Sequence, residues 1–185
     1  MRIFIAIAFA LFLTACSTLG PTGPSDGRSL DPLRDDIGSM LVAFDLPRTL
    51  GPAPSGELFT FDAANGGAGE HLRLLLVPGD ADAMAGNLPP PAEGRAYYVF
   101  NFSESDKAAL RNAQAAAGAR GIAGKDITIG IVPHLCTRGE VDPNVETVTI
   151  VAGIPGQTRL MPFLNHQSLA ELLRQPGSTQ MPACL

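Results

Sequence analysis

Short stretches in which apolar and polar residues alternate constrain the fold of this 185-residue chain more than any other feature. In the clearest one, Ile127, Ile129 and Ile131 alternate with Thr128 and Gly130. Successive side chains of a β-strand point to opposite faces, so a period of two predicts a strand with one buried face. Six other stretches alternate in this way or are continuously apolar, branched or aromatic, which strands also favour. They are 40–44, 57–61, 72–77, 96–102, 146–152 and 159–163.

Two helices are expected among these strands. Ser103 can cap the start of an Ala-rich segment, and Gly118 can end it, which predicts a medium helix over about 104–118. A shorter C-terminal helix is predicted over about 168–174, before Pro176 stops it. Seven short strands with turn residues between them predict a mainly β fold, an antiparallel β-sandwich with inserted helices.

The N-terminus has the pattern of an export signal. Met1 and Arg2 precede an apolar run over 3–13, and small residues follow it. A transmembrane helix needs about 20 apolar residues, so this run is too short to remain as a membrane span.

The residues Leu13-Thr14-Ala15-Cys16 resemble the lipobox of bacterial lipoproteins. The resemblance implies that residues 1–15 are a signal peptide, that cleavage occurs before Cys16, and that Cys16 and the new amine receive lipid, commonly palmitate. Ser17 stands where an Asp can hold such proteins at the inner membrane, which implies the outer membrane, facing the periplasm. The alternative is an ordinary cleaved signal followed by an unmodified cysteine.

Composition divides the rest of the chain. Residues 16–31 are rich in Gly, Pro, Ser and Thr, which indicates a lipidated cysteine on a flexible tether. Residues 32–185 are long enough for a single globular domain with its own core. The whole chain has 13 basic and 18 acidic residues and a net charge of −5, which argues against nucleic acid as a partner.

Two cysteines remain after the lipid site. Cys136 and Cys184 are predicted to form a disulfide, because export places them outside the reducing cytosol. Two free thiols, or a metal pair with His134, are the alternatives. No metal or cofactor is otherwise expected.

Catalytic motifs in a folded setting are missing from the sequence. There is no His-Glu-x-x-His and no Cys-x-x-Cys, and the one Gly-x-Ser-x-Gly, at 23–27, falls in the expected tether and not in the strand-to-helix turn of a nucleophile elbow. The histidines His71, His134 and His166 are interpreted as surface or boundary residues, with His166 in a loop. Asp80 and Asp82 favour a solvated turn over a calcium pair, since the next residues supply no oxygen ligands. The segment 34–36 is interpreted as a helix start or a solvated patch.

The stretch 98–103, a helix and then 127–139 faintly resemble the first half of an OmpA-like peptidoglycan-binding domain. His134 and Gly139 match the family's ligand loop, but Cys136 stands where that family has its ligand-binding Asp. The family's next helix is also missing, because 145–152 predicts a strand. The resemblance would imply cell-wall binding.

The sequence therefore favours a membrane-anchored envelope lipoprotein without catalytic activity, which binds another envelope protein or supports an assembly. A hydrolase or small-ligand site built from loops near His134 is the alternative. A pocket holding His134 and a carboxylate would favour the ligand site, whereas a flat apolar patch would favour partner binding.

Overall fold

The computed structural model describes residues 30–65, 68–155, 160–174 and 181–184. The expected signal peptide, Cys16 and most of the expected tether lie outside these residues. No helix in the described ranges is long and apolar enough to cross a membrane.

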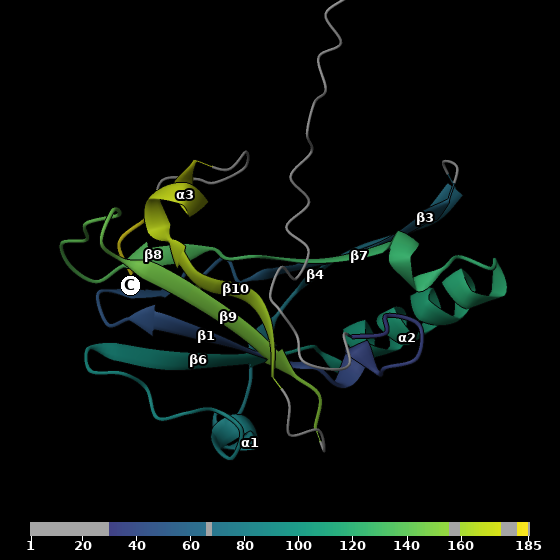
Figure 1. Ribbon diagram of the computed structural model, residues 1–185, viewed down its shortest axis with the longest axis horizontal. Coiled ribbons are helices and arrows are strands. Elements are labelled where there is room, and N and C mark those ends of the chain that lie inside the picture. The colour runs from purple at the N-terminus through teal and green to yellow at the C-terminus, as the bar shows by residue number, and fades with distance from the viewer. Residues whose placement is uncertain (1–29, 66–67, 156–159, 175–180, 185) are drawn as a thin grey trace, which may run out of the picture.

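The described chain is mainly β, with helices inserted between strands (Figure 1). The strands are β1 (Leu41–Pro47), β2 (Leu50–Pro52), β3 (Leu58–Asn65), β4 (Ala68–Leu75), β5 (Val77–Pro78), β6 (Arg95–Asn101), β7 (Ile127–Val132), β8 (Leu135–Thr137), β9 (Thr147–Gly153) and β10 (Leu160–Ser168). The helices are α1 (Asp82–Ala85), α2 (Glu104–Ala119) and α3 (Leu169–Leu173), with 3-10 turns η1 (Ile37–Ser39) and η2 (Gly124–Asp126).

The strands form three antiparallel sheets. Five strands pair in the order β10-β9-β1-β6-β5, three in the order β4-β3-β7, and β2 pairs with β8. In the five-stranded sheet, the central strand β1 pairs with β6 on one side and β9 on the other. β3 is the central strand of the three-stranded sheet, and α2 lies below this sheet in Figure 1.

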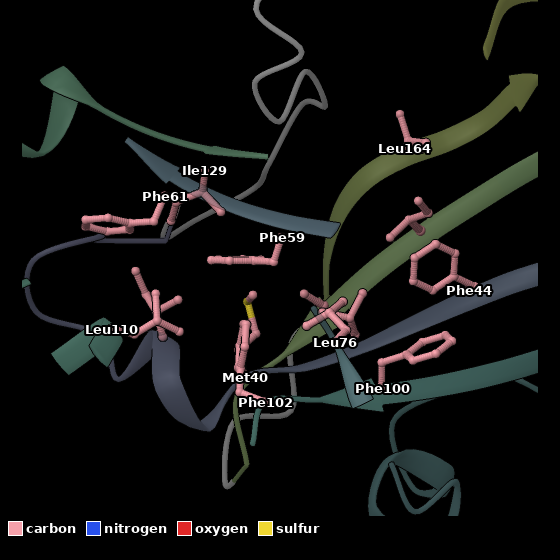
Figure 2. Close-up of a cluster of buried hydrophobic side chains, with 14 of the residues drawn as sticks. Met40, Phe44, Phe59, Phe61, Leu76, Phe100, Phe102, Leu110, Ile129 and Leu164 are labelled. Atoms are coloured by element: carbon pink, nitrogen blue, oxygen red, sulfur yellow. The ribbon is translucent and has the colours of Figure 1, made fainter. Parts of the chain in front are cut away.

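One hydrophobic core joins the inner faces of the two larger sheets. Phe44 and Phe100 come from the five-stranded sheet, and their rings meet edge to face at 5.1 Å. Phe59 comes from β3 and meets Phe102, just before α2, at 4.8 Å. Leu110 of α2 is fully buried in the same core (Figure 2). The fold thus packs two sheets and one helix around a shared apolar centre.

Helix α2 begins where the sequence predicts it. The Ser103 hydroxyl accepts a hydrogen bond from the Asp106 backbone N–H, which satisfies one of the unpaired donors of the first turn. Leu110, Ala113 and Ala117 form its buried stripe. The predicted end at 118 is one residue from the observed end.

A second, smaller cluster lies on the other face of the five-stranded sheet. Met84 of α1 packs on Ala43 and Val99, which point away from the main core. Figure 1 shows α1 below this sheet. The sequence prediction had a turn here and no helix, because four residues are too few to show a helical period.

The disulfide Cys136–Cys184 is confirmed, with the two Cα atoms 5.0 Å apart. Backbone hydrogen bonds join Thr137 to Pro182 and to Cys184, so the last described residues run along β8. The bond and this short pairing together hold the C-terminal segment against the two-stranded sheet.

The mainly β fold with antiparallel sheets, one medium helix and a short C-terminal helix is therefore confirmed. All seven predicted strands are present, and β2, β5 and β8 add to them. The placement of His166 in a loop was wrong, because it lies in β10 at an irregularity in the pairing with β9. Its φ of 48° marks that irregularity, which a strand pattern in sequence does not show.

Candidate functional site

His134 lies in the short link between β7 and β8. Its backbone oxygen accepts a hydrogen bond from the Ala53 N–H at 2.7 Å. Its ring atom Nδ1 lies 2.7 Å from the Gly56 carbonyl oxygen, to which a protonated Nδ1 donates. The side chain is half-buried. His134 therefore ties the link to the segment that precedes β3.

A carboxyl group lies beside His134, that of Glu57, which no sequence motif singles out. Glu57 is fully buried, at 0 % exposure. Its Oε2 accepts a hydrogen bond from the backbone N–H of His134. Its other oxygen, Oε1, has no hydrogen-bond partner among the described residues. An uncompensated buried carboxylate is costly, so this side chain is stable here chiefly in its neutral form.

Burial raises the pKa of Glu57 from 4.5 to about 8, and the hydrogen bond from the His134 N–H opposes this rise only in part. Glu57 is therefore mostly protonated at neutral pH. A signal for its burial was present in the sequence, because Glu57 has the same strand parity as Phe59 and Phe61, which are both buried.

The carboxyl group of Glu57 and the imidazole of His134 do not bond each other. Each makes a separate contact with the backbone of the neighbouring segment. In an acid–base pair, one group must be held within hydrogen-bonding reach of the proton that it removes. This pair instead joins β3 to the link before β8, next to the disulfide at Cys136, as a structural clamp.

The outer face of the three-stranded sheet begins directly beside this clamp. Leu58 follows Glu57 and points the opposite way, and its cross-strand neighbours are Leu75 on β4 and Val132 on β7. Leu75 is 54 % exposed and Val132 is 40 % exposed, while Leu58 is half-buried. We call these three residues the apolar strip.

Polar residues continue the same outer face away from the apolar strip. The next row along β3 is Thr60, flanked by Arg73 and Gly130, and the row after that is Asp62, flanked by His71 and Thr128. The apolar strip thus has a polar border on one side, an arrangement that is common at protein contact sites.

His71 forms an exposed pair with Asp62, in which Nδ1 and Oδ1 lie 2.8 Å apart. The backbone N–H of His166 donates to the hydroxyl of Thr149 at 3.0 Å. These contacts lie on two different sheets, so the structure does not bring the three histidines together.

Asp80 and Asp82 form a local turn. The backbone N–H of Asp82 donates to Oδ1 of Asp80 at 2.9 Å, just before α1. No group of three or more potential metal-binding side chains occurs in the described part of the chain.

The segment 34–36 lines a shallow hollow of about 440 Å³ against α2. Asp36 precedes η1, and the guanidinium of Arg111, hydrogen-bonded to it at 2.9 Å, lowers the pKa of Asp36. Gln114 donates to the carbonyl oxygens of Pro32 and Asp35. These bonds fasten the start of the domain to α2.

The position that corresponds to the ligand-binding Asp of OmpA-like domains is the disulfide-bonded Cys136. Comparison of the chain with protein families, with curated proteins and with solved structures gave no match.

Proposed function

We propose that the protein is a lipid-anchored lipoprotein of the bacterial cell envelope whose β-domain binds another envelope protein and catalyses no reaction. The apolar strip of Leu58, Leu75 and Val132 is the observation that carries this proposal. It is an exposed apolar row on an ordered sheet, bordered by polar residues, and such surfaces favour protein contacts.

The N-terminal sequence supports the anchor. The lipobox-like residues Leu13-Thr14-Ala15-Cys16 precede the described domain, whose first described residue, Leu30, packs against the core. A lipid at Cys16 would attach this domain to the periplasmic side of the outer membrane, as Ser17 implies.

The clamp of Glu57 and His134 supports a structural role for these two residues. A ligand site at His134, the alternative from the sequence, would need both groups to face a bound molecule. In this fold the imidazole lies within hydrogen-bonding distance of the Gly56 carbonyl oxygen, and the carboxyl group of Glu57 is fully buried.

The anchor is tested by growing cells with an alkyne analogue of palmitate. We expect the full chain to be labelled and processed, and Cys16→Ser to be neither labelled nor cleaved. Equal labelling of both proteins, or none of either, would refute the anchor at Cys16.

The binding role is tested by crosslinking in intact cells, with mass spectrometry of the products. We expect one recurrent envelope protein with the wild-type chain, and its strong reduction by the double variant Leu75→Ser, Val132→Ser. Val145→Ser is the matched control, because Val145 is 73 % exposed but lies outside the sheets. Equal reduction by the control, or no recurrent product, would contradict binding through the apolar strip.

A further inference from the structure

The free edges of the two larger sheets differ in how well they are protected against pairing with another strand. Natural edge strands are kept from pairing by charged residues, by proline, by bulges or by being very short. At one edge of the five-stranded sheet, β10 contains Pro162 and two irregularities in its register. At the other, β5 has two residues, of which one is Pro78. In the three-stranded sheet, β4 carries Glu70, His71 and Arg73.

β7 has none of these protections. Its sequence, Ile127–Val132, contains no charge and no proline, and it pairs with β3 in an unbroken register. No other strand of the described chain pairs with it. As far as the described residues go, the backbone groups of β7 that point away from β3 are therefore left for hydrogen bonding by an incoming strand.

We propose that a second copy of this chain pairs with β7, edge to edge and antiparallel, to form one continuous sheet of six strands. An uncharged strand is complementary to itself, because pairing about a two-fold axis opposes no like charges. In the pair, the free edge of β7 in each copy is covered by the other copy. The outer edges of the new sheet would be the charged β4 strands, so association stops at two copies and does not extend into a fibre.

The alternation of β7 is compatible with such an axis through Gly130. This register sets Thr128 opposite Val132 of the second copy, and both residues point to the outer face. The apolar inner face of one copy would then continue into the inner face of the other, and the outer faces would continue in the same way.

The contact area of two six-residue strands is small compared with the roughly 1,000 Å² of a stable interface. Pairing is therefore expected to be weak in dilute solution and much stronger where many copies share one membrane, because attachment raises the effective concentration. This expectation rests on the proposed lipid anchor, so the test is made with the full chain in intact cells.

The test introduces one free thiol at either edge of the sheet and adds a bismaleimide crosslinker with a reach of about 15 Å. Thr128→Cys and His71→Cys are matched, because both residues are exposed, share a face and flank Asp62. In the proposed pair the two Thr128 positions lie about 14 Å apart and the two His71 positions about 28 Å apart, from strand rise and spacing. We expect a covalent dimer from Thr128→Cys at a yield several-fold above that from His71→Cys.

A lysine introduced on the edge strand β7 gives a second measurement. Adding Val132→Lys to Thr128→Cys should reduce the dimer about three-fold or more, since lysine disfavours edge pairing. Adding Leu75→Lys, in the same row but on β4, should leave the dimer unchanged. Equal yields from the two cysteine variants, no dimer, or an adduct with a different protein alone would overturn pairing with a second copy.

The unsubstituted chain separates this inference from the anchor. Cys136 and Cys184 are bonded to each other, so a dimer formed by the unsubstituted chain would report a free thiol at Cys16 and refute the lipid anchor. The β7 contact would still be tested in that case, by whether Thr128→Cys gives a higher yield of crosslinked dimer than His71→Cys.

Discussion

Replacing Glu57 with glutamine should change how the stability of the protein depends on pH. The folded-state pKa of Glu57 is about 8, against an ordinary value of 4.5. A carboxyl group whose pKa is raised in the folded state holds a proton that the unfolded chain has already lost. Its contribution to stability is therefore complete below about pH 4.5 and is lost as pH rises toward and through 8.

The magnitude follows from the size of the rise. Within this window each pH unit costs up to about 1.4 kcal/mol, so Glu57 should lower the free energy of unfolding by about 2.5 kcal/mol between pH 5 and pH 7. Glutamine removes this loss, because it does not titrate. Its amide oxygen can still accept the hydrogen bond from the His134 N–H.

At pH 5 the Glu57→Gln variant should be less stable than wild type by about 1–3 kcal/mol. The reason is that its amide N–H₂ group takes the position of Oε1, which has no partner among the described residues. Because wild type loses stability with rising pH and the variant does not, their stabilities should cross between about pH 6 and pH 8.

The assay is urea unfolding at a series of pH values, followed by far-UV circular dichroism, because the chain has no tryptophan. Glu140→Gln is the control, since Glu140 is exposed, and it should follow wild type. All three histidines are kept in every variant, so the difference between the curves isolates Glu57. Parallel curves for wild type and Glu57→Gln from pH 5 to pH 8 would refute a neutral, buried Glu57.

Three further predictions concern stability and use the same unfolding assay. Cys136→Ser and Cys184→Ser should each lower the free energy of unfolding by about 4 kcal/mol in the chain-entropy model, because either change opens the same 48-residue span. The double variant should be no less stable than the single variants, and clearly unequal losses from the two single variants would contradict the pairing. Ser103→Ala should cost about 1 kcal/mol by removing the N-cap of α2, whereas Ser103→Thr should keep most of it. Gly69→Ala should cost roughly 1–3 kcal/mol, because a Cβ at this position would clash with the Ala63 carbonyl oxygen. Gly86→Ala, with open space around it, should change stability by less than about 0.5 kcal/mol, and equal effects of the two glycine variants would show that this close approach is absent.

Local sequence patterns determined the secondary structure and the disulfide. The alternation of Ile127, Ile129 and Ile131 placed β7, and Ser103 placed the start of α2, because strand parity and helix capping depend on neighbouring residues alone. The disulfide followed from there being two cysteines besides Cys16, which needs no knowledge of the fold. Where the local pattern is too short, as in α1, β2, β5 and β8, the sequence did not predict the element.

The candidate site depended on contacts between distant residues. His134 could be named from the sequence, but Glu57 lies 77 positions earlier, and no local pattern connects the two residues. Their separate backbone contacts could not be predicted, because these contacts depend on how β3 pairs with β7.

The sequence by itself thus determined the seven longer strands and the two helices α2 and α3 of the described chain, the buried face of the alternating strands, and the cysteine pair. Only the tertiary structure decided that Leu58, Leu75 and Val132 form one exposed row and that β7 is an unprotected edge. The physical reason is that strand order and register are set by packing over the whole core. A residue's own neighbours fix its face, but not the strand that lies beside it.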